Sequence, residues 1–404
     1  MSGTFVMMMA AGGVAEQPID GQTGVWLKSG GVTISSGMKM IGAVVSSGQT
    51  QYVYSRGVVD LPQILGVGRI FVSNGGVASH CYISGGLNAA RLEVAAGGTA
   101  VSCTLDAGDL YINGYPVAGT IIDAVAYAGR TNLANYANLS NYTHSGGSLD
   151  AGAGGGPKRI YGLNIYGGGA TIYGNTIVYD LMLHGGSMTV RTNGKVSGAT
   201  IQSAAPITVS SGGTVTSLTV ESGGSLTVRS GGLVVSGTVS GTSALADVSS
   251  GGAASSITIQ SGGRVNVWTG GALTDVATDS GTLVLYGGSA NGITHNGGTF
   301  LLQAGGAFAS GVVTYAGAMT VASGGSIYSL TVSGNKSPQI SGSCSGATVA
   351  ANGLLQAMPG GTIAAVTVES GGSLYVRSDG SALAVVSNTG AVVSVYAGGY
   401  IEYA

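Results

Sequence analysis

The sequence predicts an all-β fold in which the chain coils into a parallel β-helix, or β-solenoid, of about 19–20 turns. One observation behind this prediction is a unit of 17 to 20 residues that recurs along the chain. Another is an alternation of apolar and polar residues with a period of two, without any sustained helical stripe. The third is composition: 76 of the 404 residues are Gly and 44% are hydrophobic, but only 7% are charged. Such a chain can bury a core.

A triplet of apolar-Thr-apolar character marks each repeat. Clear copies are LTV at Leu218, ITI at Ile257 and VTV at Val366, whereas VAT at Val276 keeps its place by spacing alone. Each triplet is followed by two polar residues, a glycine pair, a short alternating strand and a second Gly-rich corner. The triplets begin at Leu163, Leu181, Ala199, Leu218, Gly237, Ile257, Val276, Ile293, Val313, Leu330, Ala347, Val366 and Val385.

The short alternating strand is clearest in SLTVRS, residues 225–230. Leu226 and Val228 fall on one face of such a strand, and Ser225, Thr227 and Arg229 fall on the other. One turn cannot bury its apolar face alone. Stacked turns can, because each strand pairs with its copy in the next turn, about 4.8 Å away.

Glycine pairs stand where the chain must turn sharply between strands. Gly takes positive φ at little cost, so these pairs are predicted to form the corners. The best examples lie in the nearly identical stretches TVESGGSLTVRSGG and TVESGGSLYVRSDG, and in the unit between them: Gly223, Gly224, Gly231, Gly232, Gly262, Gly263, Gly371 and Gly372.

Four segments are predicted from the quality of the repeat. Residues 1–23 form an N-terminal cap or leader, and residues 24–113 form degenerate β-helix turns, with VWLKSGGVTISSG, RIFVSNGG, CYISGG and CTLDAG as worn copies. Residues 114–160 break the pattern with RTNLANYANLSNYTHSGG and AGAGGG, and are predicted to be an irregular excursion from the stack. Residues 161–404 are regular β-helix repeats.

The stretch VSSGGTVTSLTVESGGSLTVRSGG resembles the strand-loop-strand repeats of bacterial autotransporter passenger domains, and among them the self-associating adhesins of the diffuse-adherence type. The resemblance covers Gly162 to Tyr400 well and Gly24 to Gly114 loosely. It implies a right-handed parallel β-helix at the bacterial cell surface or outside the cell, a role in adhesion or self-association, and glycosylation of Ser and Thr. Two departures from the family are the lack of a normal signal peptide and of strands for a C-terminal membrane barrel.

Composition excludes several other classes of protein. The formal net charge of −2, without a basic run, argues against nucleic acid as a partner. No apolar stretch is long enough for a transmembrane helix. Cys81, Cys103 and Cys344 are too few for a disulfide scaffold. Cys81 and Cys103 share a slot on successive turns, where they could be bonded or could be two buried thiols; the second interpretation is favoured.

A carbohydrate-active β-helix is the alternative function. A polysaccharide-cleaving site needs carboxylates that converge on one groove. Asp106 and Asp109, like Asp275 and Asp279, stand near corners and are predicted to make local turn hydrogen bonds. If Asp106, Asp109 and Asp123 met on one face, an enzyme would be favoured. No such triad is evident from the sequence, so no catalytic site and no cofactor are predicted.

Histidine and acidic residues also give no metal site. His80, His144, His184 and His295 are dispersed and lack ligand spacing. His295 takes the slot of Val220 and is expected to face inward. The Asp that a calcium-binding β-roll requires in every repeat is absent.

Outward positions carry Ser, Thr, Asn, a few Arg and aromatic residues. There are 19 Tyr against four Phe. Tyr either caps strand edges or forms a wet contact surface for carbohydrate or protein. The predicted contact residues, centred on NYANLSNY, are Tyr136, Tyr142, Trp268, Tyr375, Arg191, Arg229 and Arg377.

Low charge gives a long β-rich protein little electrostatic defence against self-association. The final stretch, GGYIEYA, does not read as a polar cap, so lateral or end-to-end association is expected. The predicted function is therefore a non-enzymatic, extracellular or surface-displayed solenoid that acts in adhesion, self-association or fibre formation. Its partners are further copies of itself or a cell-surface protein or glycan. A plain spacer for another domain is a third hypothesis.

Overall fold

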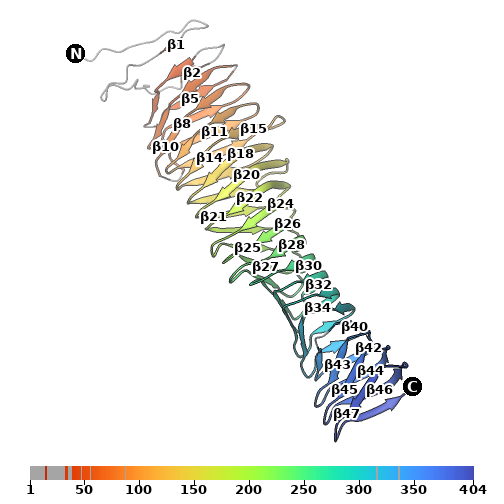
Figure 1. Ribbon diagram of the computed structural model, residues 1–404. Coiled ribbons are helices and arrows are strands. Elements are labelled where there is room, and N and C mark those ends of the chain that lie inside the picture. Colours follow the sequence, from red (N-terminus) through yellow and green to blue (C-terminus); the bar gives the residue numbers. More distant parts are fainter. Residues whose placement is uncertain are drawn as a thin grey trace, which may run out of the picture. The chain divides into compact units, whose positions relative to one another are not determined.

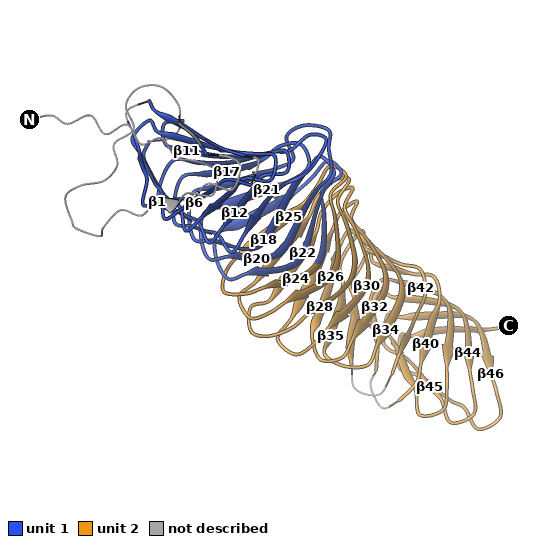
Figure 2. Cartoon of the chain, turned by 90° about the horizontal axis from the view of Figure 1, so that it is seen from above, with its two compact units in different colours: residues 1–197 blue, residues 198–404 orange. Residues whose placement is uncertain are grey.

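The computed structural model describes residues 14–15, 32–34, 39–46, 48–54, 56–86, 88–314, 317–334 and 337–404. The chain divides into two compact units, residues 1–197 and 198–404 (Figure 2). All regular elements in the described ranges are β-strands, and together they make a β-solenoid of about 19 turns, which confirms the predicted fold class (Figure 1). The described residues include no helix that could cross a membrane. Most of the predicted segment 1–23 lies outside them.

Unit 1 contains two parallel sheets. Sheet A carries the triplets, and sheet B carries the short alternating strands. The strands of sheet A are β1 (Val14–Ala15), β3 (Lys39–Ile41), β4 (Val44–Val45), β6 (Val58–Asp60), β7 (Gln63–Leu65), β9 (Val77–Ser79), β10 (Tyr82–Ser84), β12 (Thr99–Val101), β13 (Thr104–Leu105), β15 (Gly119–Ile122), β16 (Val125–Ala126), β18 (Ala137–His144), β20 (Lys158–Ile165) and β22 (Thr176–Leu183). Those of sheet B are β2 (Val32–Ile34), β5 (Thr50–Val53), β8 (Arg69–Val72), β11 (Arg91–Ala95), β14 (Asp109–Asn113), β17 (Arg130–Leu133), β19 (Ser148–Ala151), β21 (Gly169–Ile172) and β23 (Ser187–Val190).

Unit 2 repeats this arrangement, and the boundary between the units falls within β24 (Lys195–Ile201). The strands of sheet A are β26 (Thr214–Val220), β28 (Leu233–Val239), β30 (Ala253–Ile259), β32 (Ala272–Thr278), β34 (Ser289–His295), β36 (Ala307–Phe308), β37 (Gly311–Val313), β39 (Ser326–Ile327), β40 (Leu330–Val332), β42 (Ser343–Val349), β44 (Thr362–Val368), β46 (Ser381–Ser387) and β48 (Tyr400–Tyr403). Those of sheet B are β25 (Pro206–Val209), β27 (Ser225–Val228), β29 (Leu245–Val248), β31 (Arg264–Trp268), β33 (Thr282–Tyr286), β35 (Thr299–Leu302), β38 (Ala318–Val321), β41 (Gln339–Ile340), β43 (Leu354–Ala357), β45 (Ser373–Val376) and β47 (Val392–Val395).

Consecutive turns pair in the predicted register with one exception. The triplet predicted to begin at Val313 is wrong by two residues, because Ile293 pairs with Gly311 and Gly311 with Leu330, which makes Gly311–Val313 the triplet of that turn. In sheet A of unit 2, Leu218 pairs with Gly237, which pairs with Ile257, so the triplets form a column. In sheet B, Leu226 pairs with Ala246, which pairs with Val265. Residues that share a slot on successive turns are called a column below. The first and third triplet residues and the alternating apolar residues face inward, as predicted.

The two glycines of a pair serve different purposes. Gly231 has φ +72, so it occupies the left-handed region that the corner requires. Gly232 has no such φ, but a Cβ on it would lie 2.2 Å from the carbonyl oxygen of Val209 on the neighbouring turn. Positive φ therefore explains only the first glycine, and close approach of two backbones explains the second. The same holds for Gly223 and Gly224, Gly262 and Gly263, and Gly371 and Gly372.

A third corner has one residue of positive φ in place of a glycine pair, and in four of the long strands of sheet A this residue is itself a glycine: Gly162, Gly198, Gly292 and Gly346. Each long strand of sheet A bends just before its triplet, at a residue with positive φ. Ser217 (φ 56), Ser256 (φ 54) and Asp275 (φ 54) hold this position in unit 2, and Asn141 (φ 51) and Asp180 (φ 56) in unit 1. Short polar residues tolerate the left-handed region better than branched ones do. The bend divides each sheet A strand into two arms, both of which contribute to the core.

The predicted excursion over residues 114–160 is wrong. Strand β18 pairs in register with β15, β16 and β20, and β19 pairs with β17 and β21, so this segment remains within the stack. Lys158 holds the glycine-rich stretch AGAGGG within the stack of turns. Its buried ammonium donates to the carbonyl oxygens of Gly156 (2.8 Å), Gly174 (3.1 Å) and Gly154 (3.3 Å). These bonds hold the corner against the next turn.

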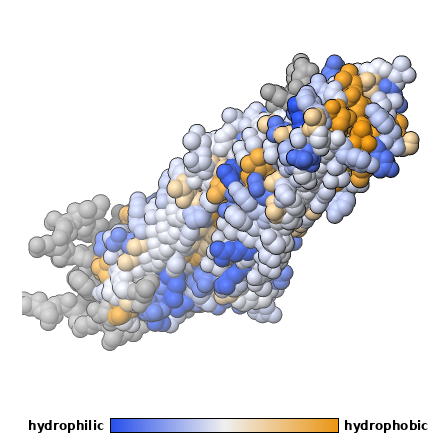
Figure 3. Space-filling view, turned by 90° about the horizontal axis from the view of Figure 1, so that it is seen from below, coloured by the Kyte–Doolittle hydropathy of each residue, from blue (hydrophilic) through white to orange (hydrophobic). Residues whose placement is uncertain are grey.

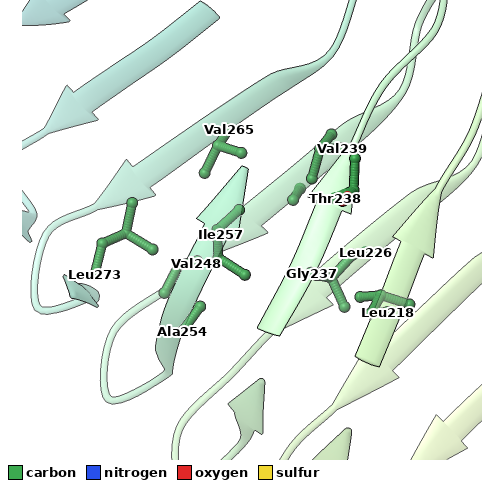
Figure 4. A pocket seen from close by; sticks show the side chains of 11 residues that line it. Leu218, Leu226, Gly237, Thr238, Val239, Val248, Ala254, Ile257, Val265 and Leu273 are labelled. Carbon is green, nitrogen blue, oxygen red and sulfur yellow. The ribbon is translucent and has the colours of Figure 1, made fainter. Parts of the chain in front are cut away.

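The core of unit 2 contains one underfilled place among its described residues. Gly237 and Ala246 occupy columns that carry Leu218, Ile257, Leu226 and Val265 on the neighbouring turns. An internal cavity of about one water molecule results, and its lining is nearly all apolar (Figure 4).

Candidate functional site

The outer face of sheet B carries the most organised surface groups of the described chain. Trp268 of β31 is 43% exposed, and its indole stacks on Tyr286 of β33 with ring centroids 4.6 Å apart and planes 15° apart. The two residues are paired in register on successive turns. The indole Nε1 donates to Oδ1 of Asp247 on β29, at 3.1 Å. Three neighbouring turns thus fix one exposed aromatic ring.

A second set of bonds ties the same group together. Arg264 donates from Nε to Oδ1 of Asn266 (2.8 Å) and from its terminal nitrogen to the hydroxyl of Tyr286 (2.8 Å). Asn266 donates to Oδ1 of Asp247, at 2.9 Å. Between these side chains Val284 is fully buried although it occupies an outward position of β33. We call this group the Trp268 cluster: Asp247, Arg264, Asn266, Trp268 and Tyr286.

A similar group lies further along the same face of unit 2. Arg377 packs over the ring of Tyr396 at 4.3 Å and over that of Tyr375 at 5.5 Å, and the two rings meet at 6.2 Å. Its Nε and a terminal nitrogen donate to Oε1 of Gln356, at 2.8 and 2.6 Å. We call these four residues the Arg377 cluster. The predicted contact residues Tyr375 and Arg377 are thereby brought together.

Unit 1 presents arginine and tyrosine on its sheet B as well. The guanidinium of Arg91 lies 4.2 Å from the ring centre of Tyr111. Arg130 binds Oδ1 of the buried Asp109 through Nε at 3.1 Å, and both arginines border a polar recess with Asn132. The predicted residue Arg191 packs over Tyr173 at 5.3 Å. Cation–π pairs thus recur on this face: Arg191 and Tyr173 share a column, whereas Arg91 reaches Tyr111 diagonally, since Tyr111 itself pairs with Glu93.

Tyr142 was expected on the surface, and this expectation is wrong. The side chain is fully buried, and its hydroxyl hydrogen bonds to Thr131 inside the unit. Burial raises the pKa of the Tyr142 phenol. Tyr136 is half-buried and its ring packs against that of Tyr115, at 5.5 Å. Arg229 is exposed, as predicted.

The carboxylates that could have favoured an enzyme each bind a different partner. Asp106 accepts hydrogen bonds from Tyr82 (3.1 Å) and Ser84 (3.2 Å), Asp109 pairs with Arg130, and Asp123 accepts from Asn141 (2.9 Å). Asp109 lies on β14 of sheet B, whereas Asp123 lies at the corner between β15 and β16 of sheet A. In the described ranges no group of three or more His, Cys, Asp or Glu side chains could hold a metal ion.

Two histidines and three cysteines of the described chain are buried. His295 faces inward, as predicted, with Nδ1 bonded to the Thr278 hydroxyl and Nε2 3.2 Å from the carbonyl oxygen of Ala318. Burial lowers the pKa of His295 and that of His144. Cys81 and Cys103 are free, buried thiols on successive turns, and burial and the contact with Cys103 raise the pKa of Cys81. The third thiol, Cys344, is also buried and free.

Sequence reasoning identified Trp268 but missed the residues that hold it. Asp247 and Tyr286 lie 21 and 18 positions from Trp268, close to one repeat length, whereas Asn266 lies only two positions from Trp268 on the same strand. Aligning outward positions by the repeat could have found them.

On the face shown in Figure 3 most of the surface has intermediate hydropathy, with separate hydrophilic and hydrophobic patches.

No protein-family model matches this chain, and no curated protein matches it. Among solved structures, the chain is similar to the TibC-catalysed hyper-glycosylated TibA55-350 fragment, known from a crystal structure. The two share 22% sequence identity over 93% of this chain and 95% of that one, with a TM-score of 0.24.

Proposed function

We propose that this protein is a non-enzymatic adhesive β-solenoid, displayed at a bacterial surface or outside the cell, that joins cells or further copies of itself. The observation that carries the proposal is the outer face of sheet B, where aromatic and arginine side chains form fixed clusters in both units. Tyr, Trp and Arg are the residues most enriched in the energetically important parts of protein interfaces. Asp106, Asp109 and Asp123, the carboxylates that could have favoured an enzyme, are each bound to a different partner.

Repetition suits such a surface. Each cluster alone gives a weak contact, but several contacts on one chain can be made together and strengthen binding without any new type of interaction. A net charge of −2 over 404 residues opposes the approach of a second copy very little. Glycosylation of outward Ser and Thr, implied by the family resemblance, is part of the proposal and is tested by intact-mass measurement of protein from its native host.

The experiment is clustering of beads coated with the purified chain, combined with light scattering of the free chain. Wild type should cluster beads and show concentration-dependent association. A Tyr375→Ser/Arg377→Ser/Tyr396→Ser variant should do so markedly less. The matched control changes two stacked, outward tyrosines of sheet A, Tyr161→Ser/Tyr179→Ser, and should behave as wild type. A strictly monodisperse wild type that never clusters beads or cells would overturn the proposal, as would release of reducing ends from polysaccharides.

A further inference from the structure

We propose that the Trp268 cluster binds a neutral pyranose ring, that is, one sugar residue of a glycan. The inference deepens the adhesive function proposed above by naming a class of ligand, and its biological role rests on that function. The cluster was described above as a set of contacts within the protein. Its chemistry also leaves groups free to meet a ligand, and three features of it select a sugar.

The first feature is an open aromatic face. Tyr286 covers only the side of the Trp268 indole that faces the following turn. Val248 pairs with Val267, so the residue beside Trp268 on the preceding turn is Ser249. Its short side chain cannot cover an indole ring. The C–H groups on one side of a pyranose are slightly positive and are attracted to the negative face of an aromatic ring.

The second feature is a pair of polar groups on the two turns that precede this face. Both hydrogen bonds that fix Asp247 go to Oδ1, and Oδ2 is left as an acceptor for a sugar hydroxyl. Arg229 occupies the same column as Trp268 two turns earlier, since Val228 pairs with Val248 and Val248 with Val267. At ~4.8 Å per turn the two side chains start about 9.6 Å apart. Two van der Waals contacts of about 4 Å fit within this distance, so one ring can lie between them.

These two groups also give a charged ligand no net advantage. An anion attracted by the guanidinium is repelled by the carboxylate, and a cation attracted by the carboxylate is repelled by the guanidinium. A neutral ring with several hydroxyls satisfies both, because each hydroxyl can donate to Asp247 or accept from Arg229. An aromatic ligand would stack on Trp268 equally well but would leave Asp247 Oδ2 unpaired, and that loss lowers affinity.

The third feature is rigidity. Asn266 is only 7% exposed and Val284 is fully buried beneath the network, so the indole is already held in one orientation. Binding then requires little ordering of side chains, which is otherwise a substantial cost for a weak ligand. The cluster has the composition typical of small-ligand sites, with an apolar surface and a few fixed polar groups.

The test uses the full chain with Trp26→Phe, which leaves Trp268 as the sole tryptophan, since the sequence has two. Methyl pyranosides of glucose, galactose, mannose and N-acetylglucosamine are titrated while tryptophan emission is recorded, with choline and benzoate as charged probes. We expect at least one neutral glycoside to change the emission saturably. In saturation-transfer NMR on the same glycoside, Trp268→Ala should weaken binding about tenfold or more, and Asp247→Asn should weaken it too. Tyr161→Ser is the matched control and should leave binding unchanged.

Three results would overturn the inference: no neutral glycoside changes the emission, a charged probe binds in preference, or binding survives Trp268→Ala in a chain with the native circular dichroism spectrum. If Trp268→Ala does not fold, Trp268→Phe and Asp247→Asn decide in its place. Bead clustering separates the two proposals. Clustering without glycoside binding rejects the sugar site and leaves the adhesive function intact. Glycoside binding without clustering rejects the adhesive function and leaves the sugar site intact.

Discussion

The cavity in the core of unit 2 allows the packing of the solenoid to be tested by filling it. Ala246 lines the cavity from the inner face of β29, in the column where Leu226 precedes it and Val265 follows. We therefore consider Ala246→Val, which places in this turn the residue type already present in the next one. Val is also favoured in strands.

The expected gain follows from what the change adds. Two methyl groups enter a site that is already closed to water, and each is worth about 0.8 kcal/mol when buried. Fixing the Val side chain costs about 0.5 kcal/mol in rotamer freedom. The net expectation is a stabilisation of about 1 kcal/mol. The opposite change in the same column, Val265→Ala, removes the same two groups and enlarges the cavity, so it should destabilise the protein by about 2–3 kcal/mol.

Urea unfolding followed by circular dichroism measures both effects, with the slope of the transition checked for each variant. Because the two residues line one cavity, their effects on the free energy of unfolding should not add. The double variant should be more stable than the sum of the two single changes predicts. A loss of stability in Ala246→Val would refute the reasoning, since it would mean that the space is already filled. So would Val265→Ala without measurable cost.

The remaining predictions concern corners and buried polar groups. Gly232→Ala should destabilise by about 2 kcal/mol or more because its Cβ would meet the Val209 carbonyl oxygen. Gly371→Asn, at φ +77 where a Cβ would make only ordinary van der Waals contacts, should cost less than 1 kcal/mol by the same urea assay. Lys158→Met leaves three carbonyl groups without their donor and should lower the free energy of unfolding by about 1–3 kcal/mol. Burial lowers the pKa of His295, so the unfolded chain binds protons first, and stability should fall as the pH drops below ~6.5; His295→Gln should reduce this fall.

The periodic part of the fold could be predicted from sequence because the same geometric requirement recurs in every turn. Parity and spacing predict that Leu226, Val228 and the two apolar residues of the triplet at Leu218 face inward, and all four are buried. Even VAT at Val276 pairs with the triplets on both sides of it. The sequence signal of one repeat is weak, but the repeats before and after it fix its position, so even a degenerate triplet can be aligned.

The segment 114–160 shows where this reasoning fails. Tyr142, Thr143 and His144 pair with Leu163, Asn164 and Ile165, so YTH is a triplet with an aromatic and an imidazole in the apolar slots. Read by residue type these side chains look like surface groups. Inside unit 1 the Tyr142 ring stacks near His144, and its hydroxyl is satisfied by Thr131. A tyrosine hydroxyl can be buried if it finds a hydrogen-bond partner. Whether it finds one depends on a neighbouring strand that the local sequence does not reveal.

Outward networks were harder to predict than the core for a related reason. An inward slot accepts only apolar residues of suitable volume, so its content identifies it, whereas an outward slot accepts almost anything. Trp268 is held by Asp247 and Tyr286, which stand 21 and 18 residues away, because Tyr286 shares its column on the following turn whereas Asp247, on the preceding turn, pairs with Asn266. Only the register of β29, β31 and β33 makes them neighbours. It follows that variants in the corner between β29 and β31 should weaken ligand binding at the Trp268 cluster, since a shifted turn would move Asp247 away from the indole together with Ala246 and Val248, its core neighbours on β29.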